Sequence, residues 1–375
     1  MTVTQFPFLP GLDLSEALYR EAVYPILSRN FPGLATSAAL LGSGSEVLGF
    51  DTSQSPDHDW GPRLMLFLSE ADFPRCHDEV DEALRRELPR EVRGFPIDLA
   101  RRDAKPSGDP AHHHVQILTV RQLFRCIVKL DIEQEITPLD WVLVPQQQLR
   151  SLTAGRVFDD GLGQLEPARA KLAYYPHDVW LYLLAAQWMR ISQEEPFMGR
   201  TGQVGDEIGS RLVAGRLVKD LMNLGFLLER QYAPYIKWFG TAFSRLNCAR
   251  VFNPLFEQVF AAATWQARQP PLARALETAA QLHNRLAITP SLPEQAEPFF
   301  NRPFLVIGGE RFFEAIHAQI HDPRVLDLPP KLGGVDQYVD STDAINFLNE
   351  EMDEIKKTCG SISAASHARL LPHTP

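Results

Sequence analysis

Two aspartates that lie two residues apart carry the clearest chemical signal in this sequence. Asp57 and Asp59 flank His58, and Asp59 opens the segment 59–68, whose apolar residues predict a buried strand. Residues i and i+2 of a strand point to the same face, so both carboxylates can be presented to one point. Hard divalent cations take oxygen ligands, and Mg²⁺ keeps water and phosphate oxygens as its other ligands. The spacing therefore predicts a Mg²⁺ (or Mn²⁺) site at Asp57 and Asp59.

A Gly-Ser stretch upstream predicts a place for the phosphates. Gly42, Ser43, Gly44 and Ser45 form a short segment that can turn and offer backbone N–H groups and hydroxyls to an anion. It is neither a P-loop nor a GxGxxG fingerprint. The alternative is that the two glycines only permit a tight turn. Arg63 can approach a phosphate, or can form a surface ion pair.

A third carboxylate would complete a two-metal site. In-line transfer of a nucleotidyl group needs charge neutralised on the attacking and leaving oxygens, and a pair of metal ions can do this. Asp98 lies between Ile97 and Leu99 in a predicted strand, 91–99, and is the best candidate. The alternatives are a solvent-facing strand end for Asp98, and a loop of capping and turn carboxylates for residues 57–59.

The pattern of elements predicts an α+β protein with two domains. Strands and helices alternate up to about residue 165, and helical patterns dominate after it. We expect a small mixed-sheet domain at 1–165, a helical bundle at 166–358 and a disordered tail at 359–375. The predicted helices are 14–30, 70–88, 177–193, 206–231, 253–268, 271–287, 310–322 and 341–357, and the predicted strands are 59–68, 91–99 and 113–121.

Composition excludes several classes of protein. The 375 residues have a formal net charge of −10, which argues against binding of bulk nucleic acid by a broad basic face. The four cysteines are far apart and form no CxxC pair, as expected in a reducing compartment. No secretory signal and no uninterrupted apolar stretch of membrane-spanning length is visible. We expect a cytoplasmic location and no membrane partner.

The order of these motifs resembles the DNA-polymerase-beta-like nucleotidyltransferase superfamily. Over roughly residues 35–250 the chain also resembles a bacterial family of unknown function, in which a helical domain follows a nucleotidyltransferase domain. The segments that carry this resemblance are 44–51, 57–63, 193–200, 205–211 and 232–238. The architecture is similar to the kanamycin nucleotidyltransferase group. The resemblance implies Mg²⁺-dependent transfer of a nucleoside monophosphate from an NTP, with ATP the expected donor, to a hydroxyl group.

The helical motifs suggest further site residues. A carboxylate within hydrogen-bonding reach can act as a general base, and Glu195 is one candidate for deprotonating the acceptor. Arg200 and Lys237 can bind triphosphate oxygens. The alternative for such charged residues is a solvated helix surface, as for Glu207 and Arg211, which are spaced i, i+4.

Three functions remain open at this point. The first is an NTP-dependent nucleotidyltransferase that acts on a small-molecule or protein hydroxyl. The second is a catalytically silent nucleotide-binding regulatory protein. The third is a metal phosphohydrolase, suggested by the His58-Asp59 pair. The sequence predicts neither the acceptor nor the oligomeric state.

Overall fold

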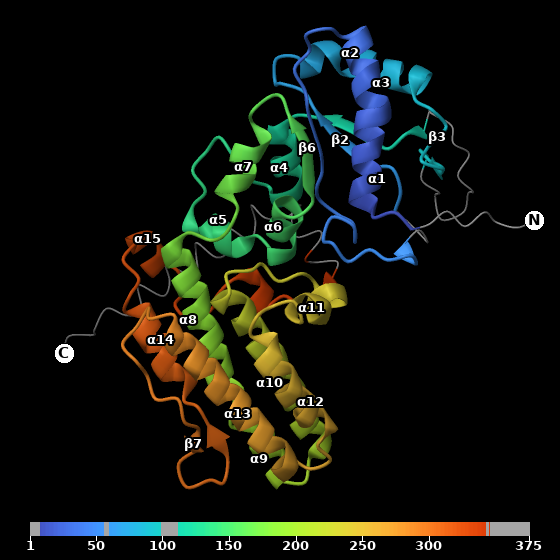
Figure 1. The fold of residues 1–375 in the computed structure, drawn as a ribbon. Helices are drawn as coiled ribbons and strands as arrows, with labels where there is room; N and C mark the ends of the chain where they lie inside the picture. The colour runs from blue at the N-terminus through green and yellow to red at the C-terminus, as the bar shows by residue number, and fades with distance from the viewer. Residues whose placement is uncertain (1–7, 56–59, 99–111, 343–344, 346–375) are drawn as a thin grey trace, which may run out of the picture. The chain divides into compact units, whose positions relative to one another are not determined.

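The chain forms two compact units. The computed structural model describes residues 8–55, 60–98, 112–342 and 345. Unit 1 consists of Met1–Ile136 and Gln148–Ala173, and unit 2 of Thr137–Gln147 and Tyr174–Pro375 (Figure 1). The sequence predicted one division near residue 165. The chain instead crosses between the units three times, and the expected tail at 359–375 lies outside the described residues.

Unit 1 is built on a four-stranded mixed sheet with the order β5-β2-β1-β6. The strands are β1 (Ser37–Leu40), β2 (Leu64–Phe67), β5 (Val115–Leu118) and β6 (Arg156–Asp160). β1 is antiparallel to both β2 and β6, whereas β2 is parallel to β5. The two central strands are short and apolar, so both of their faces can be covered by other elements.

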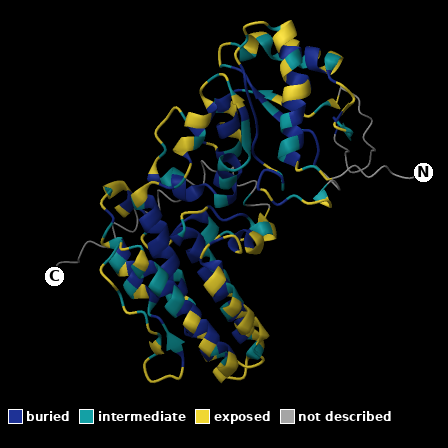
Figure 2. Cartoon of the chain, in the orientation of Figure 1, coloured by how far each residue is buried: buried dark blue, intermediate teal, exposed yellow. Residues whose placement is uncertain are grey.

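Helices cover the sheet of unit 1. Ala38 and Leu40 of β1 and Leu64 and Leu66 of β2 join one core cluster with the N-terminal helices and α3, because alternate residues of a strand share a face (Figure 2). The N-terminal helix is continuous from α1 (Gly11–Ala17) through a π-helical segment (Leu18–Val23) into α2 (Tyr24–Asn30). The other helices of unit 1 are α3 (Phe73–Glu87), α4 (Val120–Val128), α6 (Gln146–Thr153), whose first two residues belong to unit 2, and α7 (Leu165–Lys171).

Two predicted strands of unit 1 differ from the observed structure. The segment 91–99 is a hairpin of β3 (Glu91–Val92) and β4 (Phe95–Pro96), because Arg93 and Gly94 have φ angles of 51° and 85° and turn the chain. The segment 113–121 ends as a strand at Leu118, because Thr119 caps the start of α4. The segment 59–68 is a strand only from Leu64 onward within the described residues.

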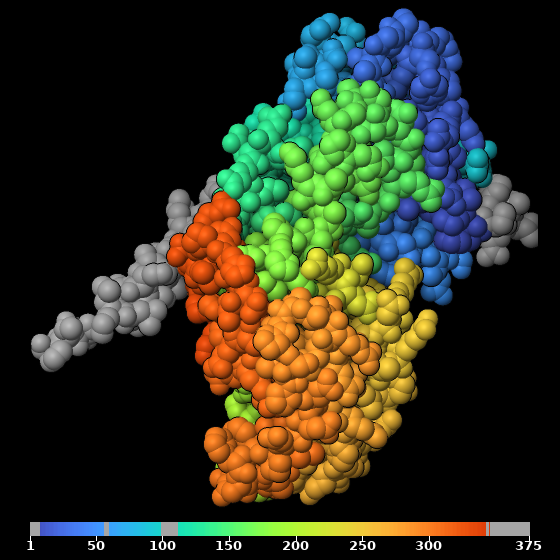
Figure 3. Space-filling model, turned by 60° about the vertical axis from the view of Figure 1, so that its left-hand side comes forward, coloured from blue at the N-terminus to red at the C-terminus, as the bar shows by residue number. Residues whose placement is uncertain are grey.

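Unit 2 is helical. α8 packs against α10 and α14, and α10 also packs against α9, α12 and α13. The helices are α5 (Pro138–Leu143), α8 (His177–Glu194), α9 (Phe197–Gln203), α10 (Glu207–Leu228), α11 (Ile236–Phe243), α12 (Ala249–Ala261), α13 (Trp265–Arg285), α14 (Gly309–His317), α15 (Pro323–Leu326) and the 3₁₀ turn η4 (Val335–Gln337). A small hairpin joins β7 (Glu297–Pro298) and β8 (Leu305–Val306). Residues of α13 and of the segment that follows it, coloured orange, form much of the face of unit 2 seen in Figure 3.

The predicted fold class is confirmed: a small mixed sheet and a set of packed helices form an α+β protein. The predicted helix at 253–268 is wrong at its end, because α12 stops at Ala261 and Thr264 caps a new helix, α13. The predicted helix at 341–357 falls almost entirely outside the described residues. Within the described residues, no helix combines the length and the apolar character needed to cross a membrane.

A buried carboxylate fixes the start of α14. Glu195 is 5% exposed and accepts hydrogen bonds from the N–H groups of Ile307 (2.6 Å), Gly308 (3.1 Å) and Gly309 (3.2 Å). The first N–H groups of a helix have no acceptor within the helix, so this side chain replaces the missing partners. Burial raises the pKa of Glu195 to about 7, although these N–H groups and Arg311 favour its ionised form.

We predict that Glu195 contributes to the pH dependence of stability. Its folded-state pKa of about 7 lies above the unfolded value, about 4.3, so the folded protein binds an extra proton between these two values. The free energy of unfolding should therefore fall as the pH rises through this window. In the wild type, this fall should be on the order of 2–3 kcal/mol between about pH 5 and about pH 8. Because the side chain of Glu195→Gln cannot ionise, the fall should be absent in this variant. Urea unfolding at the two pH values measures the free energy of unfolding of both proteins.

A neighbouring acid provides the control. Glu194 forms an ion pair with Arg216 at the surface of unit 2, so Glu194→Gln should keep the pH dependence of the wild type. Tryptophan fluorescence is a suitable probe, since Trp188 stacks on Phe312 of α14 at 4.1 Å. An unchanged pH dependence in Glu195→Gln would contradict the assignment.

Candidate functional site

The strand register brings three segments to one edge of the unit 1 sheet. Ala39 of β1 pairs with Met65 of antiparallel β2, so β1 ends where β2 begins. Leu64 of β2 pairs with Val115 of parallel β5, so β5 begins at the same edge. The Gly-Ser stretch follows β1, and Asp98 forms a bridge with His113, just before β5. The sheet therefore gathers the Gly-Ser stretch, the entry to β2 and Asp98 along one edge.

The Gly-Ser stretch is an open turn with unused N–H groups. Gly42 and Gly44 have φ angles of 85° and 135°, which L-residues rarely adopt. Within the described residues, the backbone N–H groups of Ser43, Gly44 and Ser45 have no hydrogen-bond acceptor. Ser43 is exposed, and Gly44 and Ser45 are partly exposed. Successive free N–H groups in a turn form a concave site that can bind an anion.

Hydrogen bonds on both sides hold the turn in place. The N–H of Gly42 donates to the carbonyl of Ser151 (2.9 Å), and the N–H of Gly155 donates to the carbonyl of Val47 (2.9 Å). A Cβ on Gly155 would collide with the carbonyl of Leu40, so the loop before β6 approaches the end of β1 closely. The turn is thus anchored at both ends, whereas its central residues are exposed or partly exposed.

Arg63 lies over this turn. Its Nη2 donates to the carbonyl of Ser43 (2.8 Å) and forms an ion pair with Glu46, whose side chain is 1% exposed. A Cβ at Gly44 would collide with the Arg63 guanidinium and would lie 2.6 Å from Oε2 of Glu46. Arg63 therefore joins the expected phosphate site, but Glu46 balances its charge. Glu46 was not among the residues predicted from the sequence, although its place two residues after Gly44 was a signal.

Asp98 is buried at the same edge. It is 7% exposed and follows Ile97, which is fully buried. The predicted strand around Asp98 is wrong, because β4 ends at Pro96 and Asp98 forms only an isolated bridge, while Leu99 lies outside the described residues.

The side chain of His113, the bridge partner of Asp98, accepts a hydrogen bond from the N–H of Val115 (3.2 Å) and lies 3.4 Å from the carboxylate of Asp81. Burial lowers the pKa of His113. The His113 imidazole is therefore neutral at neutral pH.

Asp57 and Asp59 lie outside the described residues, and their role as metal ligands stays a prediction. β2 begins at Leu64, five positions after Asp59, so the strand that was expected to carry both acids is observed only beyond them. Within the described part of the chain, no group of three or more His, Cys, Asp or Glu side chains gathers as a metal site.

The remaining predicted site residues belong to unit 2. Glu195 uses its two oxygens to cap α14, which accounts for its burial, and we do not include it in the proposed catalytic site. Arg200 is exposed and bonds to Gln203 in α9 (3.3 Å). Lys237 is exposed and its Nζ lies 5.2 Å from the ring centre of Trp238. Their expected contacts with a triphosphate stay predictions.

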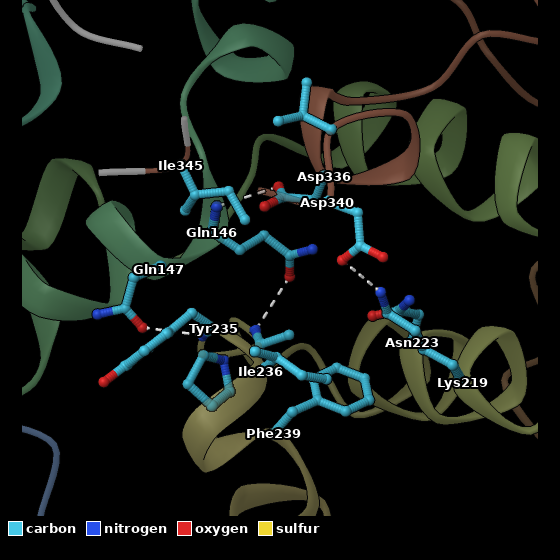
Figure 4. A pocket seen from close by; sticks show the side chains of 13 residues that line it. Gln146, Gln147, Lys219, Asn223, Tyr235, Ile236, Phe239, Asp336, Asp340 and Ile345 are labelled. Atoms are coloured by element: carbon cyan, nitrogen blue, oxygen red, sulfur yellow. Dashed lines mark hydrogen bonds and ion pairs between the residues drawn. The ribbon is translucent and has the colours of Figure 1, made fainter. Parts of the chain in front are cut away.

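Unit 2 contains a pocket of its own, with about 440 Å³ of empty space that includes its opening to solvent (Figure 4). Its polar groups mostly bind one another. The side-chain oxygen of Gln146 accepts from Ala233 N–H (3.0 Å), and the Gln146 N–H donates to Asp336 (3.1 Å). Lys219 pairs with Asp340 (2.7 Å). These contacts tie the start of α6 to the segment before α11 and to η4, and α10 to Asp340, so the pocket is a structural junction.

Comparison with known proteins gives a family similarity over part of the chain. Residues 141–239, about a quarter of the sequence, match a family described as a domain of unknown function (DUF4037). The expected resemblance to a family of unknown function is confirmed over this segment, which contains most of the residues that line the pocket of unit 2. No curated protein matches the chain.

One solved structure is a distant neighbour: a crystal structure of a nucleotidyltransferase-like protein from Exiguobacterium sibiricum 255-15, determined at 1.90 Å resolution. It is 12% identical to this chain, with a TM-score of 0.32, and the match covers 72% of this chain and 75% of that chain. A likeness at this level does not define a shared activity, and the similarity to the kanamycin nucleotidyltransferase group stays a prediction.

Proposed function

We propose that this protein is a metal-dependent nucleotidyltransferase that moves a nucleoside monophosphate from an NTP to a hydroxyl group. ATP is the proposed donor, and the acceptor is a hydroxyl of a small molecule or of a protein. The net charge of −10 favours such acceptors over bulk nucleic acid. The site is the edge of the unit 1 sheet that contains the Gly42–Ser45 turn.

The free N–H groups of the turn are the observation that carries this proposal. Ser43, Gly44 and Ser45 offer three successive backbone donors that have no acceptor within the described residues. Fixed donors of this kind suit phosphate oxygens, because they need no reorganisation when the anion binds. Arg63 adds a cationic fork beside them. The turn and Arg63 would hold the triphosphate while transfer takes place.

The register supports a place for the metal ligands beside the phosphates. Asp57 and Asp59 precede β2, which begins next to the end of β1, and Asp98 is the proposed third ligand at the same edge. A bound Mg²⁺ would neutralise charge on the triphosphate and on the leaving pyrophosphate. The carboxylates of Asp57 and Asp59 would keep that charge next to the turn.

We predict that Asp57→Asn/Asp59→Asn loses transfer activity. Without two ligand charges, the rate of transfer from labelled ATP should fall about a hundredfold or more. Release of pyrophosphate with a panel of hydroxyl acceptors measures the rate. Asp78→Asn is the matched control, because Asp78 lies fully exposed on α3 and should leave the rate unchanged. Equal rates in wild type and the double variant would reject the proposal.

The products of the same assay separate the three functions. A nucleotidyltransferase releases pyrophosphate only with an acceptor. Nucleotide binding with no turnover on any acceptor would favour a regulatory protein. Hydrolysis products that form without an acceptor would favour a phosphohydrolase.

We predict that Gly44→Ala weakens use of the nucleotide. A Cβ there would collide with Arg63 and Glu46 and would strain a φ angle of 135°. A displaced turn should lower kcat/KM on the order of a hundredfold. Gly33→Ala is the control, because Gly33 also has a positive φ angle, 90°, but a Cβ there meets no atom within 4 Å. Similar losses in both variants would show that the turn has no special role.

A further inference from the structure

The guanidinium of Arg63 is only partly used. Its Nη2 donates to the carbonyl of Ser43 and to the carboxylate of Glu46, whereas its Nε is buried and has no partner within the described residues. An arginine has five N–H donors in a fixed fork. Within the described residues Nη1 makes no hydrogen bond either, so its donors remain for another acceptor. Arg63 is therefore held by Glu46 yet can still bind an anion.

Glu46 and Arg63 lie against the turn itself. A Cβ at Gly44 would collide with both side chains, so both pack against the backbone between the free N–H groups of Ser43 and Ser45. An anion on those N–H groups would lie near both the Arg63 guanidinium and the Glu46 carboxylate, because a Cβ at Gly44 would collide with both. The first contact is attractive and the second is repulsive.

The burial of Glu46 makes its repulsion effective. Its side chain is 1% exposed and that of Arg63 is 18% exposed, so water screens the pair little. Removal of one partner of such a pair leaves the other charge uncompensated. In the protein without ligand, Glu46 therefore holds Arg63 in place, and it sets a fixed negative charge beside any anion that binds to the turn.

We propose that Glu46 is a specificity-determining residue of this phosphate site, an inference that rests on the proposed function because it takes the turn as the phosphate site. Glu46 positions Arg63 over the free N–H groups and penalises each bound anion in proportion to its charge. The penalty grows from phosphate to pyrophosphate to triphosphate. The turn thus binds a triphosphate whose charge is already partly neutralised in preference to a free polyanion. It does not retain free pyrophosphate.

Binding of inorganic anions tests this directly. Phosphate, pyrophosphate and tripolyphosphate are titrated calorimetrically into the full chain, in the presence of a chelator and at constant ionic strength. Glu46→Gln keeps an oxygen that accepts from Arg63 but removes the charge. We expect it to tighten binding, on the order of tenfold for tripolyphosphate and progressively less for pyrophosphate and phosphate. Arg63→Gln should weaken binding of all three anions.

The control removes an equal charge elsewhere. Glu87 bonds to Arg29, Asn30 and Arg86 at the end of α3, so Glu87→Gln should bind the anions as the wild type does. Unchanged or weaker tripolyphosphate binding in Glu46→Gln would overturn the proposal, and so would an equal gain for all three anions.

If Glu46→Gln does not fold, the variant Asp57→Asn/Asp59→Asn, which keeps Glu46, carries the test. The affinity of this variant for the three anions should not rise with anion charge, and a steep rise would refute the role of Glu46.

The anion-binding test of Glu46 and the transfer assay of the proposed function can fail independently. Tighter binding in Glu46→Gln, with no transfer from ATP to any acceptor, would leave the role of Glu46 standing and reject the transferase. Transfer by the wild type, with no gain of binding in Glu46→Gln, would do the reverse.

Discussion

The antiparallel register of β1 and β2 is the constraint on which the candidate site depends. Ala39 opposite Met65 fixes the end of one strand beside the start of the other. This single register brings the Gly42–Ser45 turn to the point where the chain enters β2 at Leu64. Because the side chains of a strand alternate between faces, a slip of one residue would move Ala38 and Leu40 away from the core cluster that they share with Leu64 and Leu66. The hydrophobic core of unit 1 therefore enforces the geometry of its edge.

Charge at this edge is balanced rather than maximised. A turn of free N–H groups with an arginine beside it would bind any anion, but the buried carboxylate of Glu46 offsets that arginine. The same pair holds the entry to β2 against the turn, since Arg63 precedes the strand and donates to the carbonyl of Ser43. One guanidinium thus forms a structural ion pair and would make the proposed ligand contact. The ion pair with Arg63 explains why Glu46 is buried although it lies in a loop.

The sequence predicts those features of the fold and of the candidate site that depend on local sequence pattern. The α+β class, the long buried helix at 177–193 and the turn after residues 36–41 follow from periodicity and from glycine placement. The hairpin at Arg93 and Gly94 was missed because an arginine with positive φ leaves no compositional signal. The pairing of Arg63 with Glu46 and the capping of α14 by Glu195 were missed because their partners are 17 and 112 or more positions away. Only tertiary packing creates such contacts.

A crystal structure of the wild-type chain with Mg²⁺ and a non-hydrolysable ATP analogue tests the central claim most directly. The account predicts phosphate oxygens about 2.9 Å from the backbone nitrogens of Ser43, Gly44 and Ser45, with the Arg63 guanidinium shared between the nucleotide and Glu46. A nucleotide bound in the unit 2 pocket beside Gln146 and Asp336, with the turn empty, would contradict it.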